Sequence, residues 1–249
     1  MNYVLRIQNL KYEAIINDLN IELKSNTFNI LLGKNSSGKT TLVNCISNIY
    51  KYSGNIYKSI SDKEIGIVTE KNKLLSGTVL YNLKYPLINL GKKRGIDEIV
   101  NSFSKKYGIN HLLYKDINEL SKSEYKLIQI LVSLIHDPKL FIIDDTLEDL
   151  DSLIRLKIIN NLKDLSKDIC VFWLTSNSDY LEYADNIILY DSGVIKEIIT
   201  YKQVYSKEKL FNSLGFKLPF NVEFSNKLKF YNLISDDFKN IDEVVNEIW

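Results

Sequence analysis

The stretch that decides the fold reads Phe28-Asn29-Ile30-Leu31-Leu32-Gly33-Lys34-Asn35-Ser36-Ser37-Gly38-Lys39-Thr40. Its first five residues form an apolar run that is typical of a β-strand. Beyond it, residues 40–50 carry apolar side chains at helical spacing, namely Leu42, Val43, Ile46 and Ile49. Residues 33–40 also fit the pattern G-x-x-x-x-G-K-[ST]. The pattern therefore lies where a strand passes into a helix.

This context predicts a loop that binds the phosphates of a nucleotide. The glycines let successive backbone N–H groups point inward, and the helix N-terminus adds the positive end of its dipole. We expect the ammonium of Lys39 to reach the β- and γ-phosphates and the hydroxyl of Thr40 to ligate Mg²⁺. The expected nucleotide-binding residues are Gly33, Lys34, Asn35, Ser36, Ser37, Gly38, Lys39, Thr40 and Thr41. An ordinary Gly- and Ser-rich turn is the alternative.

A second apolar run, residues 140–143, ends in the carboxylates of Asp144 and Asp145. Residues 169–174 form another continuous apolar run, with a crossover helix expected at 153–165. Runs of this kind indicate strands of a parallel sheet that is buried on both faces, so the fold class is α/β. Strands often end in Asp because it is a turn former. Beside a phosphate loop, however, a carboxylate at a strand end predicts a Mg²⁺ ligand, and we expect Asp144 to be that ligand.

The rest of the sequence predicts a large N-terminal domain and a small C-terminal appendage. Short strands are expected at 3–7 and 19–23, and the sequence from about 79 to 120 is helical and polar, most clearly at 96–107. After about residue 206 the rhythm changes to that of a small helical appendage, which includes residues 241–249. We therefore expect a nucleotide-binding domain at 1–205, with a helical subdomain at about 75–135, and an appendage at 206–249.

Composition excludes several classes of function. Lys and Arg total 32 against 31 for Asp and Glu, so the net charge of +1 creates no field that attracts nucleic acid. Residues 127–135, the longest nearly apolar run, are far shorter than the roughly 18 that suggest a membrane span. The start of the chain shows no signal segment. Cys45 and Cys170 lie in apolar contexts that suit buried reduced thiols, which favours the cytosol.

The order of landmarks resembles the ATP-binding subunit of ABC transporters. Besides the phosphate loop and the strand that ends at Asp144 and Asp145, these landmarks are the stretch 65–70, Leu120-Ser121-Lys122-Ser123-Glu124, His136-Asp137-Pro138, Leu150-Asp151, Leu174-Thr175-Ser176 and the run from Ala184 to Ile195. Residues 214–220 and 242–249 look like the C-terminal domain of the A-component ATPases of energy-coupling factor (ECF) transporters. That subfamily energises the uptake of vitamins and metal ions through separate membrane subunits.

The resemblance implies an α/β ATP-binding core with Mg²⁺, a small N-terminal antiparallel β subdomain and a helical subdomain. Two such subunits would pair head to tail, so that Ser121 acts on the partner's ATP. The chain would lie in the cytoplasm, peripheral on the inner face of the cell membrane, with membrane transporter subunits as partners. Tyr12 lies where an aromatic would stack on adenine, or it packs on a strand. Residues 79–87 either grip the membrane subunit or pack within the subdomain.

The sequence departs from the family pattern where hydrolysis is organised. The Gln expected to bind Mg²⁺ and the attacking water is Glu70, which can still ligate the cation but adds negative charge close to the γ-phosphate. The expected His of the switch is Ser176. The expected general base, Glu, is Asp145, whose carboxylate is retracted by about 1.5 Å from the contact that a base requires. Lys122 and Ser123 replace the two signature glycines. These changes predict attenuated hydrolysis.

The departures leave three interpretations open. The chain is a slow ATPase whose motifs drifted with an AT-rich genome, as its three Arg among 32 cations suggest. Alternatively it is a non-hydrolysing assembly subunit that pairs with a competent ATPase, or an ABC-type protein with no membrane partner. Both a homodimer and a heterodimer are compatible with the sequence.

Overall fold

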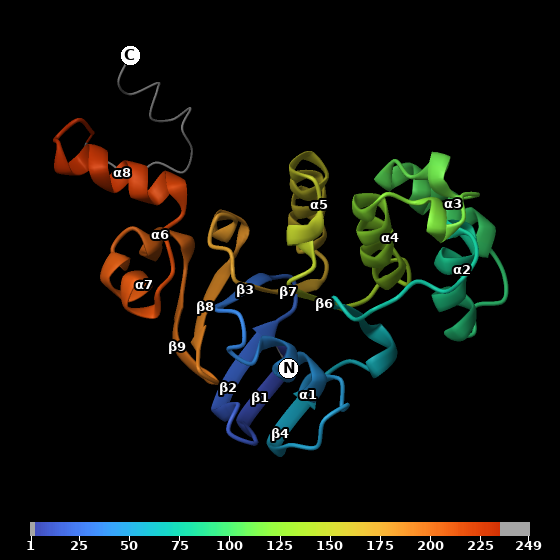
Figure 1. Cartoon of the computed structure of the whole chain (residues 1–249). Coiled ribbons are helices and arrows are strands. Elements are labelled where there is room, and N and C mark those ends of the chain that lie inside the picture. Colours follow the sequence, from blue (N-terminus) through green and yellow to red (C-terminus); the bar gives the residue numbers. More distant parts are fainter. Residues whose placement is uncertain (1–2, 235–249) are drawn as a thin grey trace. The chain divides into compact units, whose positions relative to one another are not determined.

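The computed structural model describes residues 3–234, which form two compact units. The first contains residues 3–6, 22–26 and 57–172, and the second contains residues 7–21, 27–56 and 173–234. Figure 1 shows the course of the chain. The strands form a three-stranded sheet of order β2-β1-β4 and a six-stranded sheet of order β5-β6-β7-β3-β8-β9. The expected α/β class is confirmed.

The first unit contains parallel strands and the helices α2 to α5. β5 (Ile65–Val68) pairs with β6 (Leu140–Asp144), from Ile65 opposite Leu140 to Val68 opposite Ile143. Every residue of β6 is buried, as its apolar run predicts. Figure 1 shows α2 (Val79–Asn89), α3 (Ile96–Tyr107) and α4 (Lys122–Leu134) grouped in green. α5 (Ser152–Leu165) follows β6 and leads toward β7 (Cys170–Thr175), which confirms the crossover helix.

The second unit contains β3 (Phe28–Gly33), whose six residues are all buried. β3 pairs in parallel with β8 (Asn186–Asp191), and β8 pairs antiparallel with β9 (Val194–Ile199). The smaller sheet is built from β1 (Tyr3–Tyr12), β2 (Ile16–Lys24) and β4 (Ser53–Lys58), with only three residues between β1 and β2. This hairpin and β4 occupy the positions expected of the small N-terminal β subdomain.

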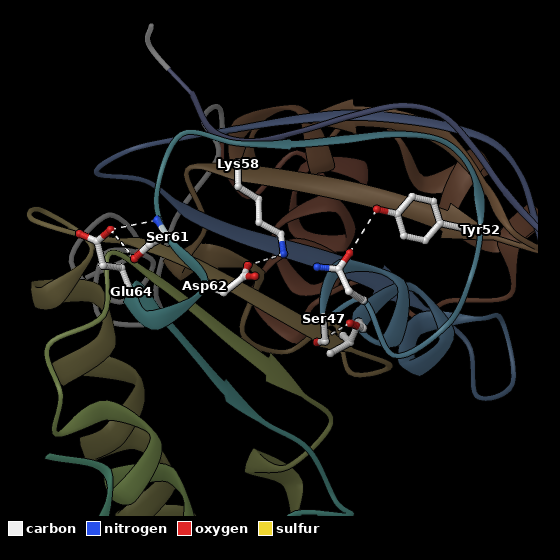
Figure 2. Close-up of polar contacts among 8 residues, drawn as sticks. Ser47, Tyr52, Lys58, Ser61, Asp62 and Glu64 are labelled. Atoms are coloured by element: carbon white, nitrogen blue, oxygen red, sulfur yellow. Dashed lines mark hydrogen bonds and ion pairs between the residues drawn. The ribbon is translucent and has the colours of Figure 1, made fainter. Parts of the chain in front are cut away.

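α1 (Lys39–Ile46) is shorter than the helix expected over 40–50. Its C-cap is Ser47, whose hydroxyl donates to the carbonyl of Val43 at 2.8 Å (Figure 2). Asn48 follows with φ 57°, a left-handed conformation that ends helices. Ile49, expected on the buried face, is therefore 67% exposed.

A 3-10 turn at Asp62–Glu64 fixes the start of β5. Figure 2 shows the Glu64 carboxylate accepting from the backbone N–H and the hydroxyl of Ser61, at 3.0 and 3.1 Å, and Lys58 donating to Asp62 at 2.7 Å. Lys139 pairs with Glu64 at 2.6 Å, and its backbone N–H donates to the Glu64 carbonyl at 2.8 Å. The hydrogen bond from Lys139, together with those from Ser61, lowers the pKa of Glu64 to about 2.

The C-terminal helices α6 (Tyr201–Val204), α7 (Glu208–Leu214) and α8 (Phe220–Phe230) are orange to red in Figure 1. Phe211 of α7 is fully buried, and the Ser178 hydroxyl donates to the Lys217 carbonyl at 2.7 Å. This part of the appendage therefore packs within the second unit. A domain boundary at 206 stays a prediction, and residues 241–249 lie outside the described part of the chain.

Two further expectations concern cysteines and membrane spans. Cys45 and Cys170 are both free and buried, which confirms their assignment as core thiols. Burial raises the pKa of Cys45 to about 11, so its thiol stays protonated. Among residues 3–234 we find no helix with the length and apolar character needed to cross a bilayer.

Candidate nucleotide site

The loop between β3 and α1 wraps around the ammonium of Lys39. This ammonium donates to the Gly33 carbonyl at 2.8 Å and to the Lys34 carbonyl at 3.0 Å. The backbone N–H of Ser37 donates to the same Lys34 carbonyl at 3.2 Å. Lys39 is only 4% exposed, so its charge is stabilised by carbonyl dipoles rather than by water. The loop thus holds a buried cation at the end of a buried strand.

Two glycines of the loop have no room for a side chain. A Cβ at Gly33 would lie 2.8 Å from Ser37 Oγ and 3.1 Å from Tyr190 Cδ1. At Gly38, where φ is 103°, a Cβ would lie 3.0 Å from both Ile15 Cγ2 and the Tyr190 hydroxyl. Only glycine adopts such a φ without strain. Packing therefore disfavours a side chain at both positions, and the left-handed backbone is a second reason for glycine at Gly38.

Tyr190 supports this loop, and no motif pointed to it. It lies on β8 directly opposite Gly33 of β3 and is fully buried. Its hydroxyl has no hydrogen-bond partner within residues 3–234, and burial raises its pKa above the usual value. The apolar run that ends at Tyr190 predicted a strand, but the function of the ring depends on the register with β3.

The N-terminus of α1 is suited to an anion. Gly38 provides no side-chain cap, and the first turn carries no acidic residue. The N–H groups of that turn are thus left for a ligand, and the helix dipole favours negative charge there. Ser37 Oγ is buried and has no partner in the described part of the chain, which is costly unless a ligand supplies one. Thr40 is exposed in the first turn and Thr41 is half-buried. These features fit a phosphate group.

Tyr12, the expected adenine partner, already stacks on an aromatic ring. Its ring and that of Tyr50 are 4.9 Å apart at an angle of 11°. One face of Tyr12 is therefore covered, and a base could stack only on the other face. The stack with Tyr50 was not expected from sequence, because Tyr50 lies in the turn after α1.

The carboxylates belong to the first unit. Asp144 ends β6 and is 3% exposed, whereas Asp145 is half-buried with φ 49°. Asp tolerates this left-handed conformation better than most residues. Thr146, next in sequence, is fully buried, and its hydroxyl finds no partner among the residues described. The segment thus places polar oxygens at the carboxyl end of a buried strand.

Mg²⁺ prefers oxygen donors, and each unit taken by itself contains such groups. Within residues 3–234, no group of three His, Cys, Asp or Glu side chains could hold a metal ion alone. Mg²⁺, however, is usually bound through one or two carboxylates together with substrate phosphates and water. Asp144 and the hydroxyl of Thr40 are oxygen donors of the kind it prefers. A nucleotide bound at the phosphate loop would therefore supply further oxygen ligands for Mg²⁺.

Glu70 lies exposed in the turn that follows β5. The turn is held by Asn72, whose side-chain oxygen accepts from the backbone N–H and the hydroxyl of Thr69 at 2.8 and 2.7 Å. The side-chain amide of Gln129 in α4 donates to the Asn72 carbonyl. Glu70 therefore lies on a turn that is hydrogen-bonded to α4. Ser176 follows the last residue of β7, in the second unit.

Ser121 is the N-cap of α4. Its hydroxyl accepts from the backbone N–H of Glu124 at 3.2 Å, and the Glu124 carboxylate accepts from the backbone N–H of Ser121 at 2.8 Å. This capping box satisfies both N–H groups. The hydrogen bond from the Ser121 backbone lowers the pKa of Glu124. Lys122 is the first residue of the helix.

The structure distributes the expected site residues between its two units. Tyr12, residues 33–41 and Ser176 belong to the second unit. Glu70, Ser121, Asp144 and Asp145 belong to the first. Their individual roles toward ATP and Mg²⁺ stay predictions.

The phosphate loop between β3 and α1 lies within a region that matches a known protein family. A family model described as ABC transporter matches residues 16–148, which is more than half of the chain. The chain belongs to the ABC transporter family. The match begins in β2 and includes both the phosphate loop and the carboxylates that follow β6.

Relatives within the ABC transporter family serve different transport systems. The chain is 27% identical to the spermidine/putrescine import ATP-binding protein PotA of Borreliella afzelii over 84% of its length, and spans 66% of that protein. It is 24% identical to the energy-coupling factor transporter ATP-binding protein EcfA of Pediococcus pentosaceus, covering 89% of this chain and 87% of that one. Membership of the family therefore does not by itself select the transport system.

A solved structure confirms the fold of this ABC family member. The structure is cbiO1 from Clostridium perfringens, described as part of the ABC transporter complex cbiONQ. It superposes with a TM-score of 0.74 at 25% identity and covers 90% of this chain and 99% of its own. The α/β architecture described above is thus that of an ABC ATPase cassette.

Proposed function

We propose that the chain is the ATP-binding motor subunit of an ECF-type ABC importer. It couples ATP binding and slow hydrolysis to the uptake of a vitamin or a metal ion through separate membrane subunits. The observation that carries the proposal is the phosphate loop, which combines a helix N-terminus without a side-chain cap, a buried Lys39 and a buried Ser37 hydroxyl that has no partner among residues 3–234. Its similarity to EcfA over 87% of that protein supports the ECF subfamily.

The proposal assigns a role to each site residue. Bound Mg²⁺ would supply charge to neutralise the phosphates. In this chain, Lys39 binds the phosphates, and Thr40, Asp144 and Glu70 are the proposed ligands of the cation. Asp145 acts as a weak base on the attacking water, and Glu70 also senses the γ-phosphate. Ser176 lies at the position where the family has the switch His, and its hydroxyl cannot donate a charged hydrogen bond to the phosphoryl group. Ser121 acts on the nucleotide of the second subunit.

The proposal also names partners and a location. The chain pairs with a second ABC ATPase subunit and with integral membrane subunits, and nucleic acid is not a partner. It lies in the cytoplasm, peripheral on the inner face of the cell membrane. The cbiO1 structure supports this assembly, because that protein is described as part of a transporter complex.

A second function is favoured by the substitutions at positions 70, 145 and 176. A chain that binds ATP without hydrolysing it would serve as an assembly subunit beside a competent ATPase. The specific observation that favours this non-hydrolysing function is Asp145, because its side chain is one methylene shorter than that of Glu and its backbone has φ 49°.

The experiment isolates the complex through a tag on this chain and measures ATP turnover with and without its partners. The motor function predicts turnover that disappears with Lys39→Ala. Assembly that needs Lys39 while turnover comes wholly from the partner subunit would favour the second function. Transport and assembly that are both indifferent to Lys39→Ala would exclude both functions.

A further inference from the structure

The turn at residues 147–151, between β6 and α5, is held from one side by Arg155. Its guanidinium donates to the carbonyls of Glu148 and Leu150, both at 2.8 Å, and to the Glu148 carboxylate at 3.3 Å. Leu147 and Leu150 are buried beneath the turn. Arg presents its donors in a rigid planar fork, so one side chain can bind several acceptors in a fixed geometry. The turn is therefore shaped by α5 itself.

Ser123 of α4 also holds this turn. Its hydroxyl oxygen accepts a hydrogen bond from the backbone N–H of Asp151 at 3.1 Å. Ser123 belongs to the first turn of α4, two residues after the N-cap Ser121, and Asp151 is the N-cap of α5. Glycine, which the resemblance leads us to expect at 123, could not make this bond. The bond joins the N-termini of two helices.

We propose that Ser123, together with Arg155, is a positioning residue that fixes the 147–151 turn to the first turn of α4. Ser121 and the 147–151 turn are then held together as one rigid surface. This inference rests on the proposed function, in which Ser121 acts on the partner's nucleotide. Lys122 and Ser123, which replace glycines, thereby remove backbone freedom and add one bond that restricts the turn.

The bond itself can be tested on the isolated full chain. Exchange of the Asp151 amide proton, followed by NMR, is expected to become about five- to tenfold faster in Ser123→Ala, as loss of one net hydrogen bond predicts. Ser123→Thr keeps a hydroxyl and is expected to retain the slow exchange. Ser102→Ala makes the same chemical change at an exposed serine of α3 and is the matched control. Equal exchange in Ser123→Ala and the wild type would overturn the proposal.

The positioning role is tested in the complex isolated through a tag on this chain. Ser123→Ala and Arg155→Lys are expected to lower kcat for ATP about fivefold while the KM for ATP stays unchanged, and Ser123→Thr is expected to restore kcat. A raised KM at constant kcat would show that Ser123 acts on the nucleotide itself, and an unchanged kcat would remove the positioning role. A wild-type complex without ATP turnover would contradict the motor function, whereas the exchange measurement would still decide whether Ser123 holds the turn.

Discussion

Tyr190 and Gly38 show how packing beneath the phosphate loop defines the site. The glycine conformation at φ 103° is strained for any other residue, and the Tyr190 hydroxyl occupies the space that a Cβ would need. The loop motif thus requires glycine at position 38, and the side chain of Tyr190, from another strand, adds a packing reason for that requirement. We therefore expect phosphate binding to depend on Tyr190, which lies outside the motif.

Gly38→Ala is expected to weaken ATP binding at least tenfold, because the left-handed conformation costs about 1 to 2 kcal/mol and the methyl group displaces Tyr190 or Ile15. Isothermal titration with ATP and Mg²⁺ measures the effect. Gly91→Ala is the matched control, since Gly91 also has a positive φ, of 83°, but a Cβ there meets nothing within 4 Å. Equal losses of affinity in the two variants would contradict the packing explanation.

Lys139 makes part of the stability depend on pH. The folded pKa of Glu64, about 2, lies below its ordinary value of 4.5, so the stabilisation is present above about pH 4.5 and is lost as the pH falls through about 2. Lys139→Gln is expected to raise the pKa of Glu64 and to lower the unfolding free energy at neutral pH. The difference from the wild type should shrink below pH 4.5.

Urea unfolding over a pH series, with an NMR titration of the Glu64 carboxyl, follows both quantities. Lys139→Arg keeps the charge and serves as the control. A difference between wild type and Lys139→Gln that stays constant from pH 7 to pH 3 would refute the assignment.

The phosphate loop and α7 are linked within the second unit. A Cβ at Gly215, the C-cap of α7 with φ 69°, would lie 2.5 Å from the Lys34 ammonium. The side chain of Lys34 therefore lies at the C-terminal end of α7, where the negative end of the helix dipole favours a cation. The appendage is thus in contact with the loop that is expected to bind phosphate.

Gly215→Ala should perturb the loop from this distance. We expect a loss of about 1 kcal/mol in stability from the left-handed backbone, and a three- to tenfold weaker ATP affinity because Lys34 is displaced. Gly108→Ala is the matched control. Gly108 is the C-cap of α3 with φ 70°, and a Cβ there would lie 3.3 Å from the ammonium of Lys157, which is not part of the phosphate loop. Urea unfolding and ATP titration separate the effects. If Gly108→Ala weakened ATP binding equally, the link through Lys34 would be unsupported.

Some of these elements were predictable because their signals are local. β3, β6 and β7 were predicted from continuous apolar runs, and the loop at 33–40 from its glycines and lysine. The end of α1 was not, because Ile49 fits the helical period while Asn48 breaks it. Tyr50, Tyr190 and Arg155 escaped prediction because their partners are set by strand register and by the turns around each helix.

Under the proposed function, ATP turnover belongs to the assembled complex, and Asp145 is the residue at which it can be tested. Asp145→Asn is expected to lower ATP turnover of the complex at least 100-fold if Asp145 is the general base. Asp145→Glu is expected to raise it, because the added methylene extends the carboxylate by about 1.5 Å toward the attacking water. Phosphate release by the complex isolated through this chain measures both.

The matched control is Asp168→Asn, an exposed carboxylate beyond the end of α5. A complex that retains full turnover with Asp145→Asn would assign hydrolysis to the partner subunit and favour the non-hydrolysing function. Lower turnover in Asp145→Glu would instead show that the left-handed backbone at φ 49° suits only the shorter side chain.

For the whole chain, residue types along the sequence were sufficient for the α/β class, the phosphate loop and the carboxylates after β6, because apolar periodicity and the loop motif are local properties. The supports of the site could not be read in the same way. Tyr190 beneath Gly38, Lys34 against Gly215, and Ser123 on the Asp151 N–H join residues far apart in the chain. Such contacts exist only after strands pair in one register and helices pack, since burial and hydrogen-bond geometry are fixed by the folded neighbours and not by sequence spacing.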